Sequence, residues 1–144
     1  PSLITKLSEH FGNQAVVVSI DVKKNMFGNY HVYSNSGTKK QRVNTLEWAI
    51  EVEKLGAGEI ILTAIHKEGT WSGFDINIIE KISNAVNIPV IANGGASSIE
   101  DIRKAVKQGN ASAVSLGSMV VYQNKGMGVL VNFPENQKLK QLLK

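Results

Sequence analysis

The 144-residue sequence contains no cysteine, which excludes a disulfide framework and metal sites built on thiolates. Aromatic residues make up only 6% of the chain, too few for the interleaved basic and aromatic stripe that binds nucleic acid. No apolar run approaches the ~18 residues that a membrane-spanning helix needs, and no signal peptide is visible. We therefore expect a cytoplasmic protein that binds neither membrane nor nucleic acid.

Charge of either sign is also sparse, since 16 Lys+Arg against 12 Asp+Glu give a net charge of +4. Much of the excess lies in segments 23–42 and 138–144, and it favours an anionic small molecule as the partner. The three histidines, His10, His31 and His66, have neither the spacing nor the acidic neighbours of a metal site. We predict no metal and no cofactor.

Apolar runs alternate with amphipathic segments, at a length that suits a single α/β domain over residues 1–144. The run Ala15–Val22 is interrupted only by Ser19 and Asp21, which is typical of a strand buried on both faces of a parallel sheet. The expected elements are helices at Ser2–Phe11, Asn44–Leu55, Phe74–Val86 and Ser98–Lys107, strands at Ala15–Val22, Glu59–Ile65, Ile88–Ala92 and Ala111–Leu116, then an apolar run at Val129–Phe133 and a helix after Pro134.

The long polar segment 23–42 follows the first predicted strand, and loops of this length are often functional. Within it we predict a hairpin in which Met26-Phe27 pairs with Tyr30–Val32. The basic residues Lys23-Lys24 and Lys39–Arg42 either steer an anionic substrate or simply lie in solvent.

The element order, α-(βα)×4 with short turns, indicates parallel strands joined by right-handed crossovers. Segments Lys54–Leu62 and Lys107–Val114 resemble each other, as expected of a duplicated barrel. Four units cannot close a barrel, which needs eight, so the alternatives are an open flavodoxin-like sheet and half of a barrel. The glycines follow the third and fourth strands rather than the first, which is typical of barrels. We predict a parallel (βα)4 half of a TIM (β/α)8 barrel.

Two strand ends rich in small residues, Gly94-Gly95 and Gly117-Ser118, carry the strongest functional signal. Glycine pairs let a ligand approach the backbone, and a helix start beside them favours negative charge. Either pair alone would indicate a tight turn, but two at successive strand ends predict a phosphate-binding mouth. Asp21 lies at the carboxyl end of the first predicted strand, where catalytic groups of parallel α/β proteins cluster, and it suits general acid–base work. A helix cap or an ion pair with Lys23 or Lys24 would be its structural alternative.

The loop after the second strand adds candidates for hydroxyl and phosphate recognition, which are Thr63, Glu68, Gly69 and Thr70. We expect His66 to be a solvated loop residue and Trp71 to cap the loop by hydrophobic contact.

Several segments together resemble the cyclase subunit of imidazole glycerol phosphate synthase, the HisF-like family. The resemblance covers essentially the whole chain and corresponds to strands five to eight of that family's barrel. Its most specific stretch is Gly56–Thr63, whereas a Gly-Gly pair is shared with many phosphate-binding barrels. The matching segments are Val16–Asp21, Trp48, Glu51–Thr63, Gly69-Thr70, Gly73–Asp75, Gly94–Ala96 and Gly117-Ser118.

The resemblance implies a cyclase of the lyase type in histidine biosynthesis. In that family, ammonia from a docked glutaminase subunit travels through the barrel core. It reacts with a ribulosyl-formimino bisphosphate and gives imidazole glycerol phosphate and an aminoimidazole carboxamide ribotide. Asp21 would be one of two catalytic aspartates and Thr63 would line the substrate channel. One substrate phosphate would be held by Glu68, Gly69, Gly95, Gly117 and Ser118.

The resemblance also implies that residues 1–144 are a fragment of a barrel of about 250 residues. An amino-terminal half-barrel, or a second copy in a homodimer, would complete it. The second catalytic aspartate and the second phosphate site belong to the absent half, so the chain alone is expected to be inactive.

Two segments depart from the family pattern. His66-Lys67-Glu68 stands where the family has Asp-Arg-Asp. The tail, with Tyr122–Lys125 and Val129–Pro134, is more similar to a paralogous branch from surface-polysaccharide (lipopolysaccharide) gene clusters. Two alternatives therefore stay open beside the histidine-pathway cyclase. One is a paralogue that supplies ammonia for sugar amidination, and the other is a non-catalytic, self-associating phosphate-binding module.

Overall fold

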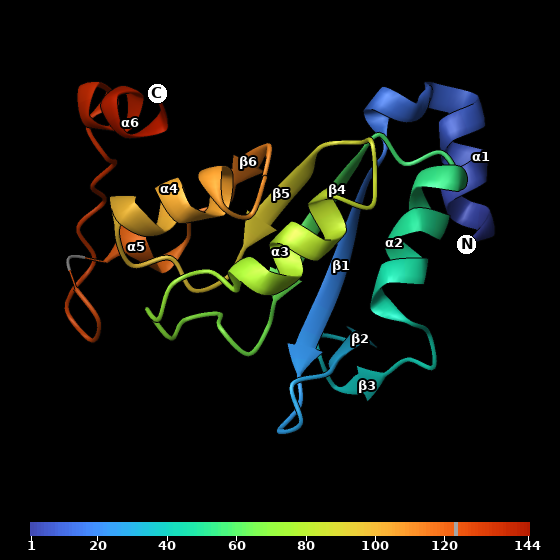
Figure 1. The fold of residues 1–144 in the computed structure, drawn as a ribbon, viewed down its shortest axis with the longest axis horizontal. Coiled ribbons are helices and arrows are strands. Elements are labelled where there is room, and N and C mark those ends of the chain that lie inside the picture. The colour runs from blue at the N-terminus through green and yellow to red at the C-terminus, as the bar shows by residue number, and fades with distance from the viewer. Residues whose placement is uncertain (123) are drawn as a thin grey trace.

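The computed structural model describes residues 1–122 and 124–144; Gln123, in the tail segment Tyr122–Lys125, lies outside the described residues. Helices pack on a mixed sheet (Figure 1). The elements are α1 (Ser2–Phe11), η1 (Asn13–Ala15), β1 (Val17–Lys24), β2 (Tyr30–Ser34), β3 (Lys39–Lys40), α2 (Thr45–Lys54), β4 (Glu59–Ala64), α3 (Ile76–Ser83), β5 (Val90–Asn93), α4 (Ile99–Lys107), β6 (Ala113–Val114), α5 (Ser118–Val121) and α6 (Asn136–Leu143). No helix within the described ranges is long and apolar enough to cross a membrane.

The main part of the sheet consists of four parallel strands within the order β3-β2-β1-β4-β5-β6. These four, β1, β4, β5 and β6, are the strands that the sequence predicts, and α2, α3 and α4 connect them. β6 is shorter than predicted, since it pairs with β5 only at Ala113 and Val114. The parallel α/β class is confirmed, while the assignment to strands five to eight of a barrel stays a prediction.

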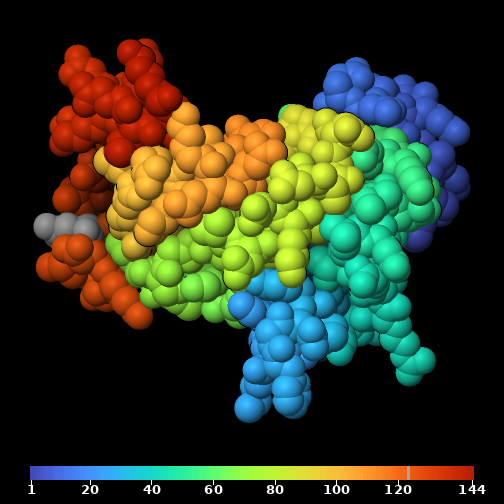
Figure 2. Space-filling view, in the orientation of Figure 1, coloured from blue at the N-terminus to red at the C-terminus, as the bar shows by residue number. Residues whose placement is uncertain are grey.

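The predicted hairpin exists with a different pairing. β1 continues to Lys24 and pairs antiparallel with β2, in a register that joins Asp21 to Tyr33 and Lys24 to Tyr30. Met26 and Phe27 lie in the turn, where they are 100% and 89% exposed, so their predicted strand pairing is wrong. The Asn25 side chain closes this turn by accepting hydrogen bonds from two turn amides. Figure 2 shows the turn projecting from the body of the molecule.

The core lies between the sheet and helices α2, α3 and α4. Successive side chains along a strand point to opposite faces, and those on the helix face are buried: Ile20, Val22, Ile60, Leu62, Val90 and Ala92. Their partners on the helices include Val52 of α2 and Ile82 of α3. Burying an Ile, Leu or Val side chain contributes about 1.5–3 kcal/mol, so this layer holds the strand ends in fixed positions.

The opposite face of the sheet is left open. Val17, Ser19 and Ala113 are exposed there, and Ile61 and Ile91 are only partly buried. The prediction that the first strand is buried on both faces is therefore wrong for this chain. The reason is that the helices between the parallel strands all pack against the other face.

The predicted helix caps agree with the structure more closely than the predicted buried face of α2 does. Asn44 caps α2 by accepting from the Leu46 and Glu47 amides, and Ser98 caps α4 in a capping box with Asp101. The spacing along α2 predicts Leu46, Ile50 and Leu55 on the buried face. Ile50 is partly buried against the core, but Leu46 is 40% exposed, and the buried residues of α2 are Thr45, Ala49 and Val52.

The tail is only partly regular. The helix expected after Pro134 is present as α6, which contacts α4. The apolar run Val129–Phe133 forms a single bridge, from Val129 to Tyr122, and stays largely exposed. The short helix α5, directly after Gly117, was not predicted.

Candidate functional site

Six of the nine predicted site residues line one hollow of about 80 Å³ at the carboxyl ends of β5 and β6. They are Glu68, Gly69, Gly94, Gly95, Gly117 and Ser118. Asn93, Ala96 and Ser115 complete the wall together with Trp71, and we call this hollow the mouth. Segments far apart in sequence thus meet at one point, while their phosphate-binding role stays a prediction.

The Gly94-Gly95 pair makes a turn that no other residue could make without moving its surroundings. Both glycines have positive φ, +96° and +100°. A Cβ on Gly95 would lie 2.4 Å from the Gly73 carbonyl oxygen, and the Gly73 amide donates to the Gly95 carbonyl oxygen at 2.8 Å. The pair therefore joins the end of β5 to the loop after β4, and residues of both segments border the mouth.

The start of α4 is not open to an anion, contrary to the simplest expectation for a helix beside a Gly-Gly turn. The Asp101 carboxylate accepts from the amides of Ser97 and Ser98, at 3.0 Å each, and from the Ser97 hydroxyl at 2.8 Å. Burial raises the pKa of Asp101, but these hydrogen bonds outweigh it and lower the pKa below its ordinary value. A phosphate in the mouth would therefore depend on the glycine turns rather than on this helix.

Asp21 lies in a row of polar residues across three strands. The register aligns Asp21 with Thr63 and Thr63 with Asn93, and the Asn93 side chain donates to the Thr63 hydroxyl at 3.1 Å. Thr63 is buried, and Asn93 also borders the mouth. Asp21 itself borders a second hollow, of about 430 Å³, with Ser19 and Tyr33.

The structural alternatives for Asp21 receive no support. Asp21 lies within β1 and caps no helix. Among the residues that the structure describes, neither Lys23 nor Lys24 forms an ion pair with it. Asn93 was not predicted as a site residue, although its place at a strand end before Gly94-Gly95 would have been a usable signal.

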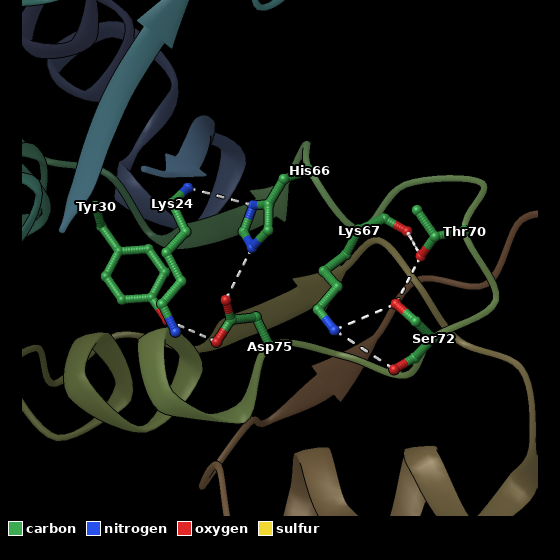
Figure 3. Close-up of polar contacts among 7 residues, drawn as sticks. All are labelled: Lys24, Tyr30, His66, Lys67, Thr70, Ser72 and Asp75. Atoms are coloured by element: carbon green, nitrogen blue, oxygen red, sulfur yellow. Dashed lines mark hydrogen bonds and ion pairs between the residues drawn. The ribbon is translucent and has the colours of Figure 1, made fainter. Parts of the chain in front are cut away.

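Thr70 is close to the mouth and does not line it. Its hydroxyl donates to the Lys67 carbonyl oxygen at 2.6 Å and shares a hydrogen bond with Ser72 at 2.7 Å. The Lys67 ammonium donates to the Ser72 hydroxyl at 3.2 Å (Figure 3). These contacts brace the loop internally, which is a structural role for Thr70.

The prediction that His66 is a solvated loop residue is wrong. Its side chain is only 18% exposed, and Nε2 lies 3.0 Å from Oδ2 of buried Asp75 (Figure 3). The Lys24 amide donates to Nδ1 at 3.4 Å, which makes Nδ1 the acceptor and Nε2 the donor to Asp75. The sequence carried no signal for this contact, because Asp75 before a helical run suggests a helix cap.

Tyr30 completes this cluster from the hairpin. Its hydroxyl donates to the other Asp75 carboxylate oxygen, Oδ1, at 2.7 Å. Burial raises the pKa of Tyr30, and the hydrogen bond to the Asp75 carboxylate raises it further. Asp75 makes no side-chain cap to α3, since both of its oxygens are engaged by Tyr30 and His66.

Within the described residues, no group of three or more histidine and acidic side chains is arranged to hold a metal ion. The basic residues Lys39 and Lys40 of β3 are exposed. Lys24 and Lys81 both lie near the Tyr30 ring, with Nζ 5.4 and 6.0 Å from its centroid.

Comparison with known proteins gives a consistent picture. The model of the family described as "Histidine biosynthesis protein" matches residues 1–126. "Imidazole glycerol phosphate synthase subunit HisF" of Prochlorococcus marinus (strain AS9601) is 48% identical over 122 residues, which cover 83% of this chain and 48% of that protein. Thr63 and the mouth glycines all lie inside the stretch that the family model matches.

Two further relatives align over nearly the whole chain. A candidate imidazole glycerol phosphate synthase subunit hisF3 from Vibrio vulnificus (strain YJ016) is 38% identical over 144 residues, 99% of this chain and 55% of that protein. A candidate subunit hisF2 from Pseudomonas aeruginosa (strain PAO1) is 41% identical over 138 residues, 96% of this chain and 55% of that protein. The chain spans about half the length of the curated relatives it matches.

Proposed function

This chain belongs to the histidine biosynthesis protein family, and on that premise we propose that it is the carboxyl-terminal half of a cyclase-like (β/α)8 barrel. The four parallel strands and the helices on one face support this assignment. So does the alignment with about half of each relative's length. The open face of the sheet would then be the interior of the barrel, covered by an amino-terminal half or by a second copy.

The edges of the sheet fit this proposal. β2 pairs with β1 only along Asp21–Lys24, so Val17–Ile20 have no strand beside them on that edge in the described chain. β6 lies at the other end of the sheet with one neighbour, β5. An open parallel sheet with a bare stretch at each end is what half a barrel would present to its partner.

We propose that the site binds a phosphorylated substrate and that Asp21 acts as general acid or base on it. The observation that carries the proposal is the convergence of Glu68, Gly69 and the two small-residue strand ends on one mouth, with Asn93 connecting that mouth to the Asp21 row. The reaction would be the ammonia-dependent cyclisation that forms imidazole glycerol phosphate, with a glutaminase subunit as the source of ammonia. The second catalytic group would come from the other half of the barrel.

The test is the Asp21→Asn variant of the complete barrel, supplied with ammonium salts so that no glutaminase is needed. We expect the cyclisation rate to fall by about 100-fold or more, because general acid–base catalysis contributes that much. Glu47→Gln, which removes an exposed carboxylate of α2 away from the mouth, is the matched control and should leave the rate unchanged. Turnover of Asp21→Asn at the parental rate would show that Asp21 has no such role.

A second candidate is a paralogue that delivers ammonia for sugar amidination, to whose branch the tail segment Val129–Pro134 is similar. Alignment of the tail alone does not separate the two candidates, because a relative named subunit HisF aligns with 96% of this chain, as the hisF2 relative does. Growth of a cyclase-deficient strain on minimal medium distinguishes the two. Restoration of growth by the complete protein would support the histidine pathway and exclude the paralogue.

A further inference from the structure

We propose that His66 is a positioning residue for the mouth. Its hydrogen bonds to Asp75 and to the Lys24 amide hold the loop of residues 66–75 in the conformation that brings Glu68, Gly69 and Trp71 to the wall. The inference rests on the proposed function, because it concerns the same site. It assigns a role to the residue that replaces the aspartate of the family pattern.

The side chains around His66 lie on the face of the sheet that the helices cover. Lys24 and Tyr30 are register partners, and they share a face of the hairpin with the buried pair Val22 and Val32. That face packs on the helices, so Tyr30 and Asp75 meet on the side away from the open face. None of the cluster side chains borders the mouth, and their effect on a ligand must pass through the loop.

His66 and Asp75 are the first and last residues of that loop. The 3.0 Å contact between them closes the eight intervening residues into a ring, which removes most of the freedom that an open loop would have. The hairpin fixes both ends of the ring, through the Lys24 amide on His66 and the Tyr30 hydroxyl on Asp75. Figure 3 shows this bridge beside the internal contacts of Lys67, Thr70 and Ser72.

The backbone inside the ring shows that it is constrained. Trp71 has φ +59°, a left-handed conformation that is costly for a bulky residue and persists only where the surroundings impose it. The Gly73 amide, two residues on, donates to the carbonyl oxygen of Gly95, which borders the mouth. Release of the His66 end would let Trp71 relax, and Glu68 and Gly69 would leave the wall with it.

Trp71 provides a direct readout, because the chain contains only 2 tryptophans. In a Trp48→Phe background, Trp71 fluorescence reports both acrylamide access and binding of inorganic phosphate. We expect His66→Ala to increase quenching of Trp71 without phosphate, and to raise the phosphate dissociation constant about tenfold, as loss of one charge-assisted hydrogen bond would. His66→Gln, whose amide can still donate to Asp75, should restore most of both properties.

His10→Ala is the matched control, since His10 is exposed on α1 and should change neither property. If His66→Ala does not fold, Tyr30→Phe removes only the hydroxyl that holds Asp75 and should give an intermediate increase in quenching. Unchanged quenching and affinity in the folded variants, or equal losses in His66→Gln and His66→Ala, would overturn the proposal. Absence of phosphate binding by the parent would count against the proposed function instead, while the quenching comparison would still decide the role of His66.

Discussion

Gly95 is the residue at which backbone geometry and the mouth are most tightly linked. An alanine there would have to adopt φ +100° and place its Cβ 2.4 Å from the Gly73 carbonyl oxygen. We expect Gly95→Ala to lower the free energy of unfolding by about 2 kcal/mol or more, measured by urea denaturation. The affinity for inorganic phosphate should fall with it.

A substitution at Gly69 separates the cost of positive φ from the cost of the contact with the Gly73 carbonyl oxygen. Gly69 also has positive φ, +68°, but a Cβ there would have no neighbour within 4 Å. Gly69→Ala should therefore show only the cost of a left-handed alanine, about 1 kcal/mol. Equal losses in the two variants would mean that the contact with Gly73 contributes nothing.

The individual site residues differ in how far the sequence predicted them. The glycines of the mouth were found because the carboxyl ends of parallel strands meet at one edge of a sheet. The sequence did not predict the cluster of His66, Asp75 and Tyr30. Tyr30 lies on a hairpin, and the pairing register of that hairpin cannot be read from its polar sequence. Contacts between side chains of distant loops have no periodic signature in a single chain.

The capping box of α4 is the element with the clearest pH dependence. Because hydrogen bonds lower the pKa of Asp101 in the folded state, its contribution is present above the unfolded pKa of about 4 and is lost as the pH falls through the folded value. We expect Asp101→Asn to lower the free energy of unfolding by about 1 kcal/mol at pH 7. The difference from the parent should shrink toward zero under acid conditions.

Glu100→Gln is the control for this prediction, because Glu100 is the preceding carboxylate and, among the residues that the structure describes, forms an ion pair only with Arg103 on the surface. Glu100→Gln should shift the urea midpoint much less than Asp101→Asn does. Added salt should remove the small shift that remains, because salt screens a surface ion pair. A parent–variant difference for Asp101→Asn that stays constant from pH 7 to acid would contradict the assigned cause.

Helix caps and strand order were predictable because they depend on local residue types and on apolar runs. The start of α3 was not predictable from the sequence. Phe74 is buried in the core and Asp75 is hydrogen-bonded to His66, and the helix begins only after them, at Ile76. The family-specific Gly56–Gly58 turn was recognised without its cause. A Cβ on Gly58 would lie 2.2 Å from the Asn13 carbonyl oxygen, so a glycine at this position lets η1 approach the turn that precedes β4.

On the scale of the whole molecule, the bare edges and open face predict self-association of the 144-residue chain. Val17 is 48% exposed on β1 at the edge that β2 does not cover. We expect sedimentation velocity to give a dimer or a larger species in place of a 15.6 kDa monomer.

Val17→Lys should weaken this association, because a lysine on an edge strand opposes pairing with another chain. Met26→Lys adds the same charge to the fully exposed hairpin turn and serves as the control. A monomer at all concentrations in the unmodified chain would refute the half-barrel interpretation of the open face.

Because β2 pairs with only part of β1, it also limits how long a strand from the other half-barrel can be where it pairs with β1. An added strand has Val17–Ile20 to lie against and must stop at the height of Asp21, where the hairpin begins. An added strand that pairs one residue out of register would turn all of its side chains to the wrong face, so the pairing along Val17–Ile20 sets which side chains of that strand face the interior.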